Sequence, residues 1–376
     1  MKKFITKTIV FSIPMLVFFL IPASFLYTSG ENYKSIEGII KSAPNYLIGY
    51  AYNEGNYKYL KYRELENRKA LSVIALGSSR ALQFRDKMFN KSFYNAAYTI
   101  SSISDFIPFM KFSLNNKNPE VLLIALDQWM FNKNWDDLSE YDLKNKVWHP
   151  SFTKKPSFST LRSVWGDLLI GKYGFEIFTK KKHDALIQIG LNSIVNNTGF
   201  RKDGSIYYGK QIKKLLDDDN TANDYDYLDT YSRIEDGNRR FQYGSQVNDK
   251  SIESLNHFLS YCKSNNIYVV AILPPFANKV AIKLDLSGKY SYMDKIFYKS
   301  NAVFKRYGFE LWDMTNLNKY GSNDSETIDG FHGGEVTYLR MLIYMIENGS
   351  ILKNYTNLNH LKNDLNKRKN NYIVYD

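Results

Sequence analysis

Two short stretches, far apart in the chain, carry the residue types of nucleophilic catalysis. In the first, Gly77 is followed by Ser78 and Ser79 after a run of β-favouring apolar residues. A strand, a tight turn and a helix would lift a serine hydroxyl out of the sheet edge and place its N–H at a helix N-terminus. In the second stretch, Asp329 precedes His332 by three residues. An aspartate at this spacing can accept the imidazole Nδ1–H, which leaves Nε2 free to act as a base towards a serine.

Each stretch also has a simpler interpretation when it is taken alone. Gly-Ser-Ser is ordinary turn chemistry, and Asp329 could belong to a turn in which His332 is a surface or capping residue. Arg80 follows the serines, and it could either orient an anionic substrate or anchor the turn. The catalytic interpretation therefore depends on whether the fold brings Ser79 and His332 together.

The sequence around these stretches alternates between apolar runs and segments of helical periodicity, which predicts buried parallel strands joined by helices. This alternation predicts an α/β fold, an open and doubly wound parallel sheet with right-handed crossovers. Ser79 and the Asp329/His332 loop follow the first and last strands, so they should meet at the carboxyl edge of the sheet. Strands are expected at 73–76, 92–95, 121–126, 267–273 and 309–313, and helices at 57–70, 80–88, 105–114, 251–264, 292–307 and 335–348.

Together the two stretches resemble the SGNH/GDSL hydrolase superfamily, whose first block holds the nucleophilic serine and whose last block is Asp-x-x-His. The resemblance covers about residues 71–346 and implies a three-layer, flavodoxin-like sheet. It puts Ser79 in the nucleophile position and Ser78 in the place usually held by an aspartate. Asp329 and His332 then complete a catalytic triad. This chemistry uses no metal or organic cofactor, and none is expected.

The sequence departs from the family pattern in the groups that would bind the oxyanion. The second block of the family offers a glycine N–H, where the nearest candidates in this chain are Ala96 and Ala97 after Asn95. The third block supplies an asparagine side chain, where this chain has Gln128, whose amide could donate instead. The neighbouring Asp127 could only accept. The expected oxyanion donors are therefore the backbone N–H groups of Ser79 and Ala97 and the side chain of Gln128.

The composition limits the class of protein. The chain has 376 residues, of which 44% are hydrophobic and 23% are charged, and this is typical of a globular protein. Its formal net charge of +12 suits an acidic polymer, an anionic membrane surface or nucleic acid. No nucleic-acid-binding motif accompanies the charge, so nucleic acid is not an expected partner. The single cysteine, Cys262, excludes an internal disulfide and a cysteine-based metal site.

The N-terminus predicts attachment to a membrane. Lys2, Lys3 and Lys7 precede the uncharged apolar stretch 9–27, which is just long enough to span a bilayer. The lysines predict a cytoplasmic N-terminus with the body of the protein on the far side. A signal peptide cleaved near Ala23 is the alternative. The expected organisation is a signal anchor at 1–30, a stalk and lead-in helix at 31–70, an SGNH-like catalytic domain at 71–350 with a largely helical insertion at 130–249, and a basic polar tail at 351–376.

These features predict an extracytoplasmic, membrane-anchored serine O-acyltransferase or esterase that acts on a cell-envelope polysaccharide or teichoic-acid-like polymer. The anchor and the Gln-Trp pair at 128–129 resemble the membrane-anchored D-alanyl transfer proteins of teichoic acid modification and related envelope acyltransferase partners. That likeness implies a polytopic membrane O-acyltransferase that supplies the acyl group. The alternative is a non-catalytic envelope protein that binds or scaffolds a polymer on the same fold. The triad does not distinguish transfer from hydrolysis, because both share the first half-reaction.

Overall fold

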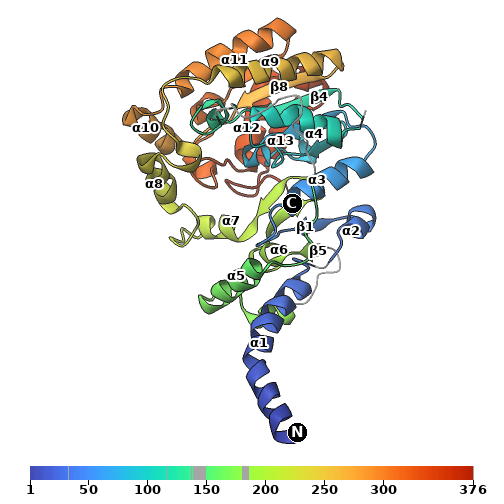
Figure 1. Cartoon of the computed structure of the whole chain (residues 1–376). Coiled ribbons are helices and arrows are strands. Elements are labelled where there is room, and N and C mark those ends of the chain that lie inside the picture. Colours follow the sequence, from blue (N-terminus) through green and yellow to red (C-terminus); the bar gives the residue numbers. More distant parts are fainter. Residues whose placement is uncertain (33, 116, 137, 139–149, 180–185, 376) are drawn as a thin grey trace. The chain divides into compact units, whose positions relative to one another are not determined.

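The structure of the protein is a computed structural model that describes residues 1–376 except 33, 116, 137, 139–149, 180–185 and 376 (Figure 1). The chain divides into two compact units. Unit 1 comprises Met1–Arg63, Pro150–Lys202 and Ile206–Lys210, and unit 2 comprises Glu64–His149, Asp203–Ser205 and Gln211–Asp376. The expected insertion 130–249 is therefore shared between the units, and its residues 150–202 belong to the same unit as the N-terminal segment.

A five-stranded parallel sheet organises unit 2. Every neighbouring pair of strands in this sheet is parallel, which confirms the prediction of a mixed α/β protein with a parallel sheet. The near-continuous apolar runs at 73–76 and 121–125 form strands that are buried along their whole length. The strands are β2 (Val73–Leu76), β3 (Phe93–Asn95), β4 (Val121–Ala125), β8 (Tyr268–Leu273) and β9 (Glu310–Asp313), in the order β3-β2-β4-β8-β9.

The helices of unit 2 follow the strands largely as the periodicity predicts. Helix α12, which leads away from the Asp329/His332 loop, is buried over most of its length. Helix α10 was not among the predicted helices. The longer helices of this unit are α4 (Phe106–Ser113), α8 (Leu228–Asp236), α9 (Asp249–Ser264), α10 (Asn278–Ser287), α11 (Met293–Tyr307), α12 (Glu335–Glu347) and α13 (Leu358–Asn366), while α3 (Asn56–Asn67) and α7 (Gly209–Leu216) have residues in both units.

The helix predicted at 80–88 is wrong. The segment instead forms two short 3-10 turns, η1 (Ser79–Ala81) and η2 (Asp86–Met88). The side-chain amide of Asn95 donates to the carbonyl oxygens of Ala81 and Phe84, at 2.8 and 2.9 Å. These carbonyls are therefore satisfied without a continuous helix, and a long-range contact decides the local conformation.

Unit 1 contains a second, four-stranded sheet that the sequence did not reveal. Its strands are β1 (Tyr46–Ile48), β5 (Ile187–Ile189), β6 (Thr198–Arg201) and β7 (Ile206–Tyr208), in the order β5-β1-β6-β7. Only the β1–β5 pair is parallel in this sheet. The buried carboxylate of Glu31 accepts the N–H groups of Ala51, Tyr52 and Leu191. Residues expected to form a stalk are thus built into a folded unit.

Helix α1 (Lys2–Ser29) opens unit 1 and is 28 residues long. Its mean hydropathy of 2.4 makes it long and apolar enough to cross a membrane. The helices α2 (Glu37–Ser42), α5 (Phe158–Leu169) and α6 (Leu191–Asn196) complete this unit. Phe25 and Leu26 near the end of α1 are fully buried in a cluster with Leu161, Val164 and Leu191.

The C-terminal residues 351–375 are folded, whereas the basic run 353–369 predicts a solvated and partly frayed end. It contains η10 (Ile351–Asn354) and α13, and the side chains of 372–375 are buried. The carboxylate of Glu335 accepts the N–H groups of Val374 and Tyr375 at 3.0 and 2.9 Å. The same carboxylate pairs with Arg85 at 2.6 Å. Apolar burial and this buried charge pair therefore outweigh the solvation of the lysines.

Candidate active site

Ser79 is positioned by a turn that requires glycine. Strand β2 ends at Leu76, and Gly77 has a φ of +144°. A Cβ atom on Gly77 would lie 3.0 Å from the carbonyl oxygen of Ala125 on the neighbouring strand. The hydroxyl of Ser78 then accepts the N–H of Arg80 at 3.1 Å. The turn therefore passes close to β4 and fixes the start of η1, where Ser79 lies.

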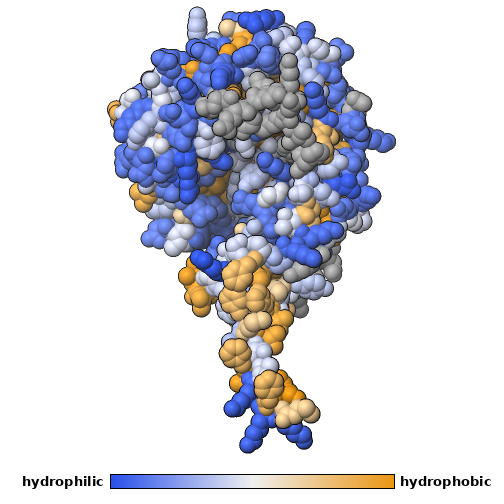
Figure 2. Space-filling view, viewed as in Figure 1, coloured by the Kyte–Doolittle hydropathy of each residue, from blue (hydrophilic) through white to orange (hydrophobic). Residues whose placement is uncertain are grey.

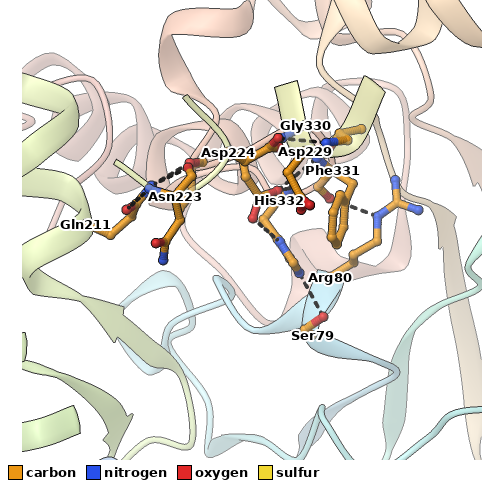
Figure 3. A network of polar contacts seen from close by, with 12 residues as sticks. Ser79, Arg80, Gln211, Asn223, Asp224, Asp229, Gly330, Phe331 and His332 are labelled. Carbon is orange, nitrogen blue, oxygen red and sulfur yellow. Dashed lines mark hydrogen bonds and ion pairs between the residues drawn. The ribbon is translucent and has the colours of Figure 1, made fainter. Parts of the chain in front are cut away.

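The structure brings the three predicted triad residues together (Figure 3). The Nε2 atom of His332 lies 2.8 Å from the Oγ atom of Ser79. Its Nδ1 atom lies 2.7 Å from Oδ2 of Asp329. The other carboxylate oxygen of Asp329 accepts the backbone N–H groups of Phe331 and His332 at 2.9 and 2.8 Å. Ser79, His332 and Asp329 therefore form one continuous hydrogen-bonded relay.

The electrostatics of the relay favour an ionised aspartate. Burial raises the pKa of Asp329, but the charge of His332, its hydrogen bond and the two backbone N–H groups together hold that pKa below its ordinary value. The carboxylate is 20% exposed and the imidazole 14% exposed, so both are largely shielded from solvent. An ionised Asp329 can hold the proton on Nδ1 and leave Nε2 as the acceptor facing Ser79.

The Asp329/His332 loop is held by residues that the sequence analysis did not identify. The N–H of Gly330 donates to Oδ2 of Asp224 at 2.8 Å, and the hydroxyl of Thr230 donates to the same oxygen at 2.6 Å. A Cβ atom on Gly330 would come within 2.6 Å of that hydroxyl. Figure 3 shows this support extending through Asn223 to Gln211. Asp224 lies in an acidic, Asn-rich stretch that carries no catalytic spacing, so no sequence signal marked it.

Of the two roles that the sequence allows for Arg80, the structure favours the anchor. Its side chain is fully buried. Its Nε donates to the carbonyl of Phe331 at 3.0 Å, next to His332 in the chain. Its remaining nitrogens donate to Gln128 at 2.6 Å and to the carbonyls of Pro274 and Pro275 at 2.8 and 2.5 Å. Arg80 therefore ties η1 to the loops that follow β4, β8 and β9.

Two of the three predicted oxyanion donors are engaged elsewhere. The N–H of Ala97 donates to the side chain of Asn95 at 3.1 Å. The amide of Gln128 donates to the carbonyl of Pro274 at 2.8 Å, while its oxygen accepts from Arg80. Gln128 is therefore oriented as a support for the buried guanidinium. The backbone N–H of Ser79 has no hydrogen-bond partner among the described residues, and it remains available.

Asp127 is a fully buried carboxylate beside this anchor. Its Oδ1 atom lies 3.5 Å from the guanidinium of Arg80. Burial raises the pKa of Asp127, against the lowering effects of the Arg80 charge and of the Ser78 hydroxyl. Asp127 therefore lies where its charge offsets that of the Arg80 guanidinium within the protein.

A cavity of about 670 Å³ opens beside the carboxyl ends of β8 and β9. Its walls include Gln128, Phe276, Tyr290, Asp313 and Asn316, and none of the triad residues lines it. Within the described part of the chain, no cluster of three side chains could hold a metal ion. Comparison with models of protein families, with curated proteins and with solved structures finds no match.

Proposed function

We propose that the protein is a serine acyl-transfer enzyme whose nucleophile is Ser79. The observation that carries this proposal is the relay in which His332 contacts Ser79 at 2.8 Å and Asp329 at 2.7 Å. Ser79 Oγ attacks an acyl carbonyl carbon while His332 Nε2 accepts its proton. The imidazolium, stabilised by Asp329, then returns the proton to the leaving group and an acyl-enzyme forms. A hydroxyl or water attacks the acyl-enzyme in the second half-reaction.

The negative charge of the tetrahedral intermediate needs a donor close to the nucleophile. The backbone N–H of Ser79 is the group that supports this role, because it has no partner in the described part of the chain. One such donor is worth about 2.7–4 kcal/mol of transition-state stabilisation. The engagement of Ala97 and Gln128 implies that any further donor comes from substrate-induced rearrangement or from another group.

The topology supports a place near the SGNH/GDSL hydrolase superfamily. Numbered within their own sheet, the strands of unit 2 run in the order 2-1-3-4-5, which is the order of doubly wound, flavodoxin-like sheets. Ser79 follows the first of these strands, and the Asp329/His332 loop follows the last. Ligands of such sheets bind outside the carboxyl ends of the strands near the switch point, which lies here between β2 and β4.

The acceptor that the proposal favours is a hydroxyl-bearing cell-envelope polymer. The apolar helix α1, with Lys2, Lys3 and Lys7 at its start, supports a single membrane span with the folded units on the extracytoplasmic side. The net charge of +12 suits an anionic glycopolymer. A polytopic membrane O-acyltransferase beside the anchor would supply the acyl group. Hydrolysis of an acyl ester on the same polymer uses the same triad.

A serine-directed fluorophosphonate tests the enzyme proposal on the full chain in detergent or nanodiscs. Wild-type protein should be labelled, Ser79→Ala should abolish labelling, and His332→Ala should slow it at least 10³-fold. Ser264→Ala is the matched control, because this serine is exposed at the end of α9. An unlabelled wild-type protein that is folded, or labelling that survives Ser79→Ala, would remove the proposal. With p-nitrophenyl acetate as acyl donor and glycerol as competing acceptor, the ratio of glyceryl acetate to free acetate among the products then separates transfer from hydrolysis.

A non-catalytic binding protein is the second candidate, and one observation favours it. The groups at the second and third family blocks, Ala97 and Gln128, face intramolecular partners instead of an oxyanion. A scaffold would bind the polymer without any reaction with the fluorophosphonate. The same labelling experiment therefore decides between the two candidates.

A further inference from the structure

Helix α1 contains a backbone carbonyl that its own helix cannot satisfy. Pro22 lies inside α1 and has no N–H, so the carbonyl oxygen of Phe18, four residues earlier, lacks its helical donor. The indole Nε1–H of Trp165 on α5 donates to this oxygen at 2.8 Å. The rings of Trp165 and Phe18 also stack, with centroids 6.4 Å apart. Trp165 therefore replaces the missing helical hydrogen bond and docks α5 on α1.

Aromatic contacts extend this docking along the last turns of α1. Phe158, at the start of α5, packs on Phe18 with ring centroids 5.8 Å apart. Phe175 and Phe178 of the 3-10 turn η5 (Phe175–Phe178) pack edge-on against Phe25, at 5.4 and 4.9 Å. The chain segment from 158 to 178 therefore packs against α1 between Phe18 and Phe25.

The outward faces of this segment are apolar and open. The large apolar side chains on these outward faces are 44% to 81% exposed, whereas Leu161 and Val164 on the inner face are buried. Within the described residues of unit 1, the exposed large apolar side chains that lie outside Met1 and α1 all belong to this segment. Figure 2 shows apolar side chains on α1 and on the surface that adjoins it. We call these residues the apolar collar: Phe158, Leu169, Ile170, Phe175 and Phe178.

The length of α1 indicates what covers the collar. Apart from Ser12 and Phe18, which are half-buried, the side chains of α1 are exposed from the N-terminus to Leu20, and the first fully buried one is Pro22. At 1.5 Å per residue, the segment from Phe4 to Leu20 spans only about 25 Å. The hydrocarbon core of a bilayer is about 30 Å thick. A membrane that contains all of the exposed part of α1 would therefore also reach the turns on which the collar packs.

We infer that the apolar collar is immersed in the edge of the lipid bilayer and extends the membrane contact of α1. The inference rests on the proposed membrane span, and the continuity of the collar with α1 selects lipid as its occupant. Helix α5 also carries Arg162 and Asp167, so it lies in the headgroup interface and does not cross the membrane. Tryptophans such as Trp165 are enriched at this depth of a membrane, because the indole ring is largely apolar while its N–H needs a hydrogen-bond partner.

Site-specific fluorescence in nanodiscs of phosphatidylcholine and phosphatidylglycerol tests the inference. Cys262 is fully buried, so a Cys262→Ser background allows single labels with the environment-sensitive dye NBD. Labels at Leu169→Cys and Phe178→Cys should be blue-shifted and quenched by brominated lipid. A label at Leu286→Cys, an exposed apolar residue of unit 2, should remain water-like and unquenched. A label at Leu16→Cys on α1 reports the span itself.

The outcomes separate the collar from the anchor. If the Leu16 label is quenched while both collar labels remain water-like, the anchor stands and the collar inference fails. If the Leu16 label is not quenched, the membrane span and the collar inference fail together. Collar labels that are blue-shifted but not quenched by lipid would show that protein covers the surface, and would also overturn the inference.

A variant pair tests the docking of α5 independently. Trp165→Phe removes the donor to the Phe18 carbonyl but keeps an aromatic ring, and it should lower the Tm of the protein by several degrees. Pro22→Ala restores a helical N–H for the same carbonyl. In the Pro22→Ala background, the Tm loss from Trp165→Phe should therefore shrink to less than half. An equal loss in both backgrounds would contradict the role assigned to Trp165.

Discussion

Arg80→Met should be among the most damaging single substitutions in unit 2. The guanidinium donates to the carbonyls of Phe331, Pro274 and Pro275 and lies 3.5 Å from the carboxylate of Asp127. Methionine fills a similar volume but leaves these acceptors and a buried negative charge without a partner. Each hydrogen bond to a charged group contributes about 1.5–3 kcal/mol, but the bonds share one side chain and do not add. Removal of one member of a buried ion pair typically costs about 3–5 kcal/mol.

This free energy corresponds to a fall in Tm of roughly 6–20 °C for a unit of this size. Circular dichroism or scanning calorimetry of the purified protein measures the fall. Arg306→Met is the matched control, because Arg306 is exposed on α11 and donates only to an asparagine side chain among the described residues. The Tm of the Arg306→Met variant should differ from that of the wild type by less than about 2 °C. Arg80→Lys keeps the charge but loses the planar fork, so its Tm should lie between those of Arg80→Met and wild type.

The same substitution should also slow the chemistry. The Nε atom of Arg80 holds the carbonyl of Phe331, which precedes His332 in the chain. Loss of this contact should make the distance between His332 and Ser79 less well fixed. Labelling by a fluorophosphonate should therefore slow at least tenfold at a temperature where the variant is folded. A Tm within 2 °C of wild type together with an unchanged labelling rate would refute the assignment of Arg80 as the anchor of the site.

Two further predictions concern carboxylates. Asp329→Asn should slow fluorophosphonate labelling about 10³- to 10⁴-fold, because the amide favours the wrong tautomer of His332. The pKa of Asp329 is lowered in the folded state, so the stability that the ionised carboxylate contributes should persist from pH 8 to 5 and be lost only as the pH falls below about 4. Measurements of the Tm of the wild-type protein against pH will show this loss. Burial and the neighbouring Asp203 carboxylate raise the pKa of Asp86 to about 6. Ionisation of Asp86 therefore lowers the stability of the folded protein as the pH rises through that value. Asp86→Asn should therefore raise Tm at pH 7.5, and a gain of the same size at pH 5 would contradict this assignment.

Much of the sheet in unit 2 could be predicted because its signals are local. A buried parallel strand is a continuous apolar run, and the runs at 73–76 and 121–125 are recognisable without any knowledge of their neighbours. The second sheet, in unit 1, could not be predicted in the same way. Its strands are three or four residues long, and a stretch of unit 2 separates β1 from the other three strands in the sequence. Such short strands form only because tertiary packing supports them.

The sequence by itself determined which residues could form the relay. The turn at Gly77 presents Ser79, and the spacing of Asp329 and His332 allows a hydrogen bond within one short loop; both are properties of a few adjacent residues. Only the tertiary structure decided that Ser79 and His332 meet, although 253 positions separate them in the chain.

The tertiary structure also decided the roles of Arg80, Ala97 and Gln128. Whether a donor is free for a ligand depends on which distant carbonyl or side chain already accepts its hydrogen. Arg80 is satisfied by residues 48 to 251 positions away, and no local pattern encodes such partners. Residue type and spacing therefore limit the chemistry that a chain can perform. Folding decides which of its polar groups remain available for that chemistry, because most buried donors are bound by acceptors that packing brings within reach.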